Sequence, residues 1–300
     1  MASESNYYIP ENSWMPVLTA TSLGTMAVGA GLAVQGLTPL VLVAGLALLA
    51  CVLYTWFSTV IQENQRGMTN AQVKRSFVMA MSWFIFSEVM FFAAFFGALF
   101  YVRIFVVPWL AGEGEKAMTH SLLWQGFSAH WPVMQTPDQT VGGAKFVGPH
   151  ESMGFPGWNK IVEWLPLWNT VLLLTSSWTV HIAHHAMKHG NRARFNAFLA
   201  LTVALGVAFV CVQYREYHEA YTAMGLTLKS GIYGTTFFML TGFHGFHVCL
   251  GAFMLSIQLL RGLKGHFKPD DQFGFEASSW YWHFVDVVWL GLFIFVYVLG

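Results

Sequence analysis

The sequence predicts an all-α membrane protein with seven transmembrane helices, and two observations carry this prediction. Of the 300 residues, 55% are hydrophobic and 10% are charged, and the mean hydropathy is +0.51. An average soluble domain has about 25% charged residues. The apolar residues also form seven continuous runs of about 20 residues, the length that crosses a hydrocarbon core of about 30 Å. Continuous rather than alternating runs indicate helices and not the strands of a barrel.

The seven runs define the predicted organisation of the chain. They are expected near residues 16–34, 39–61, 77–107, 165–187, 195–213, 231–260 and 280–299. The short connection "QGLT" predicts that the first two form a hairpin. The predicted segments are an N-terminal segment over 1–15, a two-helix hairpin over 16–61, a loop over 62–76 and a five-helix bundle over 77–300.

A long connection rich in Gly and Pro covers residues 110–163, and we expect it to form an external loop. Connections of this length are uncommon in compact folds unless they serve a function. The distribution of Lys and Arg gives the orientation. Nine of them flank the runs on the side of the N-terminus: Arg66, Lys74, Arg75, Lys188, Arg192, Arg194, Arg261, Lys264 and Lys268. The other six lie on the opposite side. This excess predicts a cytoplasmic N-terminus and a C-terminus outside.

Charge and cysteine content narrow the class of function. The formal net charge is zero, which gives no indication of nucleic-acid binding. Cys51, Cys211 and Cys249 all fall within apolar runs and show no C-x-x-C spacing. They are therefore expected to be packing residues, and no Cys/His cluster of the kind that holds zinc, iron–sulfur or dinuclear copper is predicted.

Glu88 lies near the middle of the third run, inside "SWFIFSEVMFFAAFFGALF". An ionisable side chain at membrane depth costs a few kcal/mol or more and suggests a functional site with a partner. Counting residues from the cytoplasmic ends places His247 at the same depth, with His244 as the second candidate partner. His181, His283 and Asp286 come out shallower in the same half, whereas the other half is expected to hold almost no ionisable residue.

Three interpretations of this cluster remain open. Polar side chains can hydrogen-bond across helices as structural contacts, beside small residues such as Gly242, Gly245 and Gly251. Histidines spaced i, i+3 and i, i+4 can ligate haem, although ligands from separate helices must then meet at one iron. A carboxylate and imidazoles near one surface can also collect or relay protons. A retinal photoreceptor is excluded because no Lys falls within a run, and matched halves typical of secondary transporters are not evident.

Four motifs together resemble subunit III of cytochrome c oxidase, in the haem-copper oxidase superfamily. They are "WFIFSEVMFFAAFF" at 83–96, "GTTFFMLTGFHGFHV" at 234–248, "FGFEASSWYWHFVDVVWL" at 273–290, and "LPLWNT" at 165–170 with "AHHAMKHGNR" at 183–192. The resemblance implies a helix pair and a five-helix group separated by a cleft filled with phospholipids. Quinol-oxidising relatives lack the first pair, so its presence favours the cytochrome c branch.

The resemblance also implies the partners and roles of this chain. Subunit I would carry haems and copper and subunit II the other copper centre, while this chain would hold no metal or haem. It would stabilise the complex, with possible additional small subunits, and support proton uptake on the cytoplasmic side of a bacterial plasma membrane. Glu88 matches the embedded carboxylate of the family. Residues that match the cytoplasmic mouth of the lipid cleft are Trp56, Glu63, Arg261, Lys264 and His266, the basic ones suited to anionic head groups. A quinol oxidase subunit and an independent proton or ion translocator are the alternatives.

Overall fold

The computed structural model describes residues 12–68, 71–267 and 272–300. It divides into two compact units, residues 1–80 and 81–300, which are taken separately below. Residues 1–11 of the predicted N-terminal segment, part of the predicted loop 62–76, and Lys268 lie outside the described residues. All regular elements in the described part are helices, so the all-α fold class is confirmed.

The long helices match the predicted runs but extend beyond most of them. They are α1 (Met15–Val34), α2 (Leu40–Gln65), α3 (Ala71–Tyr101), α7 (Leu165–Lys188), α8 (Arg192–Thr222), α9 (Gly231–Lys264) and α10 (Phe273–Leu292). π-Helical turns follow α3 at Val102–Val106 and α10 at Phe293–Val298. The short helices are α4 (Val107–Leu110), α5 (Ala117–Leu122) and α6 (Pro137–Thr140). Gly114–Lys116 and Trp158–Glu163 form 3-10 turns.

Six of the described helices have the length and hydropathy of membrane spans: α1, α2, α3 with its continuation to Leu110, α8, α9 and α10. The seventh predicted span, α7, has 24 residues, which is about 36 Å at 1.5 Å per residue. It is less apolar than the others because it carries Asn169 and several Ser, Thr and His residues. The described part of the protein is therefore all-helical, with six candidate membrane spans.

Helices α1 and α2 of the first unit approach each other closely at two glycines. A Cβ on Gly29 would lie 2.3 Å from the Leu42 nitrogen, and one on Gly45 would lie 2.8 Å from the Met26 nitrogen. The connection between them turns at Gly36, whose φ of +74° favours glycine. Small residues at the contact thus let the two backbones pack directly, as expected for a membrane hairpin.

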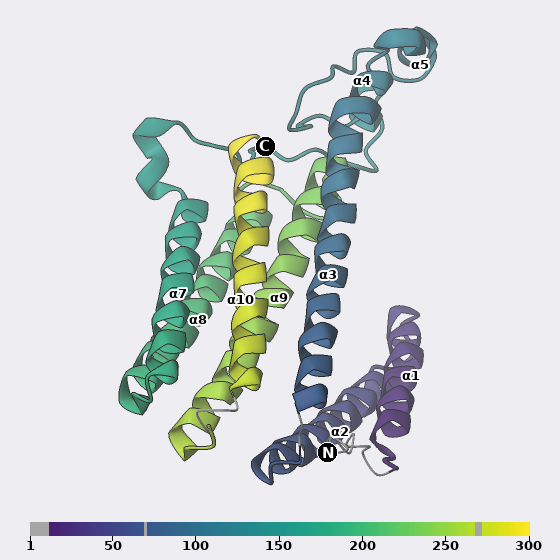
Figure 1. Cartoon of the computed structure of the whole chain (residues 1–300). Coiled ribbons are helices and arrows are strands. Elements are labelled where there is room, and N and C mark those ends of the chain that lie inside the picture. The colour runs from purple at the N-terminus through teal and green to yellow at the C-terminus, as the bar shows by residue number, and fades with distance from the viewer. Residues whose placement is uncertain (1–11, 69–70, 268–271) are drawn as a thin grey trace. The chain divides into compact units, whose positions relative to one another are not determined.

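In the second unit, α10 lies between α7 and α9 (Figure 1). It packs on its neighbours through two buried tryptophans, Trp282 and Trp289. Trp282 Nε1 donates to Ser176 Oγ (3.0 Å), and Trp289 Nε1 donates to Thr170 Oγ1 (3.0 Å), so both are fixed to α7. The Trp282 ring is accommodated by two glycines, because a Cβ on Gly206 of α8 or Gly251 of α9 would approach it to 2.7 or 2.8 Å. Four helices, α7 to α10, are thereby held around one ring.

From Met81 onward, α3 contacts α9 and α10 mainly through large aromatic side chains. Phe91 packs on Phe243 with ring centroids 5.1 Å apart, and Phe92 packs on His247 at 5.0 Å. Phe84 stacks on Tyr281 of α10 at 6.0 Å. Aromatic rings therefore supply much of the contact between this part of α3 and the helices α9 and α10.

The connection after α4 runs over the end of the bundle where the C-terminus also lies (Figure 1). It is attached by specific hydrogen bonds: Met153 N–H donates to the Tyr233 hydroxyl (3.0 Å), and His150 N–H donates to the Met224 carbonyl (2.8 Å). Thr136 and Gln139 form a capping box at α6. The predicted long loop is therefore packed on the bundle at these points.

Candidate functional site

Glu88 of α3 lies against His247 of α9. Its Oε2 is 3.0 Å from His247 Nε2, and the Glu88 and His247 side chains are 23% and 8% exposed. The other ring nitrogen, Nδ1, is 2.6 Å from the Phe243 carbonyl oxygen. Of the two partners considered from sequence, His247 makes the contact with Glu88.

The hydrogen bonds of His247 fix how many protons this contact holds. A carbonyl oxygen only accepts, so Nδ1 must carry a hydrogen and donate to Phe243. Nε2 can then accept from a protonated Glu88, or carry a hydrogen and donate to an ionised Glu88. In both cases one proton lies between Glu88 and His247, and the pair as a whole is neutral. Such a contact can exchange the proton internally without placing a net charge at membrane depth.

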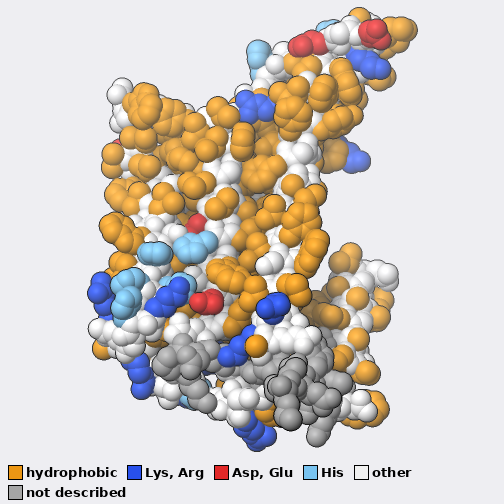
Figure 2. Space-filling model, in the orientation of Figure 1, with side chains coloured by type: hydrophobic (Ala, Val, Ile, Leu, Met, Phe, Trp, Pro, Cys, Tyr) orange, Lys and Arg blue, Asp and Glu red, His pale blue; other side chains and the backbone are white. Residues whose placement is uncertain are grey.

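His283 and Asp286 form a separate pair on α10, at 3.5 Å between His283 Nδ1 and Asp286 Oδ2. The Ser177 hydroxyl of α7 lies 2.9 Å from the same ring nitrogen. A further pair joins His184 of α7 to Glu276 of α10 at 3.3 Å. In Figure 2, histidine and carboxylate side chains gather between α7 and α10, toward the α7–α8 turn. The ionisable side chains therefore form separate pairs and not the single cluster that is expected from the sequence.

His244 and His181 do not join these pairs. His244 is buried between the rings of Phe209 and Trp289, and neither of its ring nitrogens has a partner in the described part of the chain. His181 is exposed on α7. Among the described residues, no group of three or more His, Cys, Asp and Glu side chains could hold a metal ion.

The predicted lipid-binding residues fall on both units. Trp56 and Glu63 lie on α2 of the first unit and are partly exposed. Arg261 lies over the Phe267 ring at 4.9 Å and donates to Gln258 Oε1 (3.1 Å), while Lys264 is exposed. For His266, which follows α9, desolvation and then the cations of Arg261 and Lys264 lower the pKa. The lower pKa disfavours the charged imidazole of His266, and Arg261 and Lys264 are the cationic side chains next to it.

The structure also contains a buried carboxyl group that sequence analysis missed. Glu216 is completely buried on α8, which continues to Thr222, beyond the predicted end at residue 213. Glu216 is thus an exception to the expectation that this half holds almost no ionisable residue. Charged neighbours in the sequence obscure the burial of Glu216. In the structure, two of them, Arg215 and Glu219, pair with each other at 3.1 Å on the exposed side of the same turns. Helical spacing was the available clue: Gln213, Glu216 and Ala220 share the buried face.

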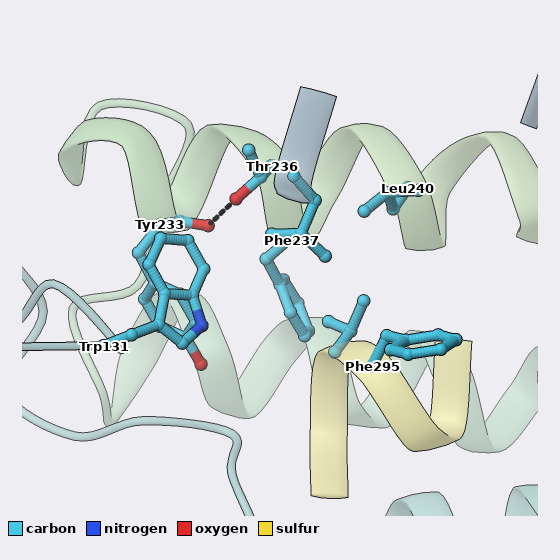
Figure 3. Close-up of a pocket in the computed structure, with 8 residues that line it drawn as sticks. Trp131, Tyr233, Thr236, Phe237, Leu240 and Phe295 are labelled. Atoms are coloured by element: carbon cyan, nitrogen blue, oxygen red, sulfur yellow. Dashed lines mark hydrogen bonds between the residues drawn. The ribbon is translucent and has the colours of Figure 1, made fainter. Parts of the chain in front are cut away.

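Two of the cavities among the described residues have defined linings, and neither lining includes Glu88. One of about 10 Å³ is lined mostly by apolar side chains, among them Trp131, Phe237, Leu240 and Phe295 (Figure 3). It has room for no more than about one water molecule. The other, of about 270 Å³, opens beside the α7–α8 turn and is lined in part by Lys188 and Arg192. None of the predicted site residues lines either cavity.

Comparison with known proteins gives the family. The family model described as cytochrome c oxidase subunit III matches residues 5–112 and 127–300. The chain belongs to the cytochrome c oxidase subunit III family. Cytochrome c oxidase subunit 3 of Hippopotamus amphibius is 35% identical over 98% of this chain and 97% of its own length. That of Scyliorhinus canicula is 36% identical over the same shares, and that of Dasypus novemcinctus is 37% identical over 88% and 85%.

Membership of this family confirms the resemblance seen in the motifs. The chain is a subunit III of cytochrome c oxidase, a membrane complex of the respiratory chain. The match includes both helices of the N-terminal hairpin. Residues 113–126, which include the 3-10 turn at Gly114–Lys116 and α5, lie outside the match. The match also includes Glu88 and His247.

Proposed function

We propose that this cytochrome c oxidase subunit III is a non-catalytic core subunit of a proton-pumping complex. It stabilises subunit I, which carries haems and copper, and supports proton uptake on the cytoplasmic side, with subunit II as the other core partner. The observation that carries the proposal is the 3.0 Å contact of Glu88 with His247 across α3 and α9. It is a polar link at membrane depth between a helix held by aromatic rings and the rest of its unit.

Within this proposal, Glu88 acts first as a structural group. The His247 ring is fixed at one side by the Phe243 carbonyl, so its other nitrogen requires a partner from α3. Glu88 supplies it and keeps α3 in register with α9. The pairs His283–Asp286 and His184–Glu276 extend the set of groups that can bind protons near the proposed cytoplasmic side.

Phospholipid binding is the second part of the proposal. The two-helix hairpin and a five-helix bundle that includes α7 as a seventh span would enclose ordered phospholipids. Arg261 and Lys264 would attract anionic head groups, and Trp56, Glu63 and His266 are the other proposed lipid-binding residues. The chain would lie in a bacterial plasma membrane with a cytoplasmic N-terminus and a periplasmic C-terminus.

Co-purification tests this function. The chain, tagged and extracted in mild detergent, is expected to bring two further membrane polypeptides with the optical spectrum of haem. The same preparation should oxidise reduced cytochrome c and consume oxygen. A quinol-oxidising complex would instead oxidise a quinol and leave cytochrome c unoxidised. Recovery of the chain alone from membranes that contain active oxidase would contradict the proposal.

A further inference from the structure

Glu216 is the centre of a buried hydrogen-bonded cluster that joins three helical elements. Its Oε1 accepts from the Tyr297 hydroxyl (2.5 Å), in the π-helical turn after α10, and from Gln213 Nε2 (3.4 Å) on α8. Gln213 Oε1 in turn accepts from Asn169 Nδ2 of α7 (3.3 Å). All four residues are buried, and Asn169, Glu216 and Tyr297 are completely so.

These hydrogen bonds use only one of the two carboxyl oxygens of Glu216. Both donors point to Oε1, which is therefore the accepting oxygen. Oε2 is buried and has no hydrogen-bond partner among the described residues. The Oδ1 atom of Asn169, in the same cluster, is likewise buried without a partner. Two buried polar atoms in one cluster require either a missing partner or a large desolvation cost.

The ionised form of Glu216 does not fit these surroundings. No described Lys, Arg or His side chain lies within 4.0 Å of it, so a carboxylate would be an unpaired buried charge. A neutral acid fits, because its carbonyl oxygen accepts from Tyr297 and Gln213 while its hydroxyl, Oε2–H, is free to donate. The missing partner must then accept a hydrogen bond from Oε2.

We propose that Glu216 is held as the neutral acid and that its Oε2–H donates to a buried water molecule. The partner must be small, because Oε2 is closed to the surface and neither a lipid nor another chain can reach it. A buried water also needs further polar partners, and the carbonyl of Asn169 is an acceptor of the required kind. The site thus holds one proton and one water molecule in the half of the bundle opposite the α7–α8 turn. It is separate from the Glu88–His247 contact, and it does not depend on the role proposed there.

Infrared spectroscopy tests the protonation of Glu216. The sample is the chain as purified, with the subunits that accompany it, and the variants are Glu216→Gln and Glu219→Gln. The difference between unmodified and Glu216→Gln samples is expected to show loss of the C=O stretch of a protonated carboxyl, with a shift in D2O. The control Glu219 is more exposed and paired with Arg215, so Glu219→Gln should lose a carboxylate band instead. Loss of a carboxylate band in Glu216→Gln would overturn the proposal.

The water molecule is tested on the unsubstituted protein, which avoids any effect of a variant on folding. An experimental map that shows other buried waters is expected to contain a density peak within hydrogen-bond distance of Glu216 Oε2. A map of that quality with no peak there, or with a protein atom of the chain bonded to Oε2, would contradict the proposal. Both measurements remain decisive if the chain is purified without partners.

Discussion

At the residue scale, the contact between Glu88 and His247 raises the question of what position 88 must supply. The side chain there could be needed for its hydrogen bond or for its ability to carry a charge. Because His247 Nδ1 is committed to the Phe243 carbonyl, Nε2 is the atom that α3 must satisfy. A neutral amide in place of the carboxyl can donate to Nε2 and keep the bond, whereas a methyl group cannot. Substitutions at position 88 therefore separate structural from proton-carrying roles.

We predict that Glu88→Gln assembles, resists heating and pumps protons nearly as the unmodified complex does. Glu88→Ala should lose about 1 to 3 kcal/mol, because it leaves a buried imidazole nitrogen unpaired, and the subunit should dissociate more readily. Gel filtration after mild heating and proton pumping in vesicles measure the two effects. Ser87→Ala is the control, since Ser87 is exposed and bonds only within α3. A Glu88→Gln complex that assembles but no longer pumps would show that Glu88 is an obligatory proton carrier.

The residue scale also shows what sequence reasoning can and cannot find. Depth alone predicts the pairing of Glu88 with His247, because both interrupt long apolar runs and residue counting gives depth directly. Glu216 is not found in this way, because residues 213–222 contain several charged and polar side chains, as is typical of a loop. Helical periodicity separates its buried face from the exposed Arg215, but that face becomes visible only when the helix is known to continue.

At the element scale, close helix packing depends on which glycines face a large ring. Gly242, Gly245 and Gly251 all lie on α9, and composition alone treats them equally. In the structure, a Cβ on Gly251 would lie 2.8 Å from Trp282, and one on Gly242 would lie 3.5 Å from the Tyr217 hydroxyl. A Cβ on Gly245 would have no atom within 4 Å. Which side chain faces each glycine depends on the rotamers and positions of residues on other helices, and these cannot be deduced from a sequence pattern.

We therefore predict that Gly251→Ala destabilises the protein by about 1 to 3 kcal/mol, the usual cost of overpacking a well-filled core. Its matched control, Gly245→Ala on the same helix, should be neutral or slightly stabilising, because alanine favours a helix over glycine by about 1 kcal/mol. Thermal denaturation in detergent, followed by circular dichroism, compares the two. Equal loss of stability in both variants would contradict the assigned packing of Trp282 against α9.

At the scale of the whole molecule, the open question is whether α7 crosses the membrane. Its hydropathy is low because it contains Asn169, Thr170, Ser176 and Thr179, yet all four side chains are buried within the bundle. Ser176 and Thr170 accept from the tryptophans of α10, and Thr179 bonds to Thr202 of α8. Polar side chains that face the bundle interior are not exposed to lipid. A hydropathy average therefore underestimates the tendency of such a helix to span the membrane. We infer that α7 spans the membrane beside α8.

Topology reporters test this seventh span. With α7 crossing, a reporter inserted after Gly157, ahead of α7, should lie on the opposite side from one after Gly190, in the α7–α8 turn. Three helices, α8, α9 and α10, cross the membrane between Gly190 and Gly300. A fusion after Gly300 should therefore lie on the side opposite to Gly190, which is the side of Gly157. An enzyme reporter active only outside the cytoplasm should therefore work at Gly157 and Gly300 but not at Gly190. Equal activity at Gly157 and Gly190 would mean that α7 does not cross, and the bundle would then have to be rebuilt around six spans.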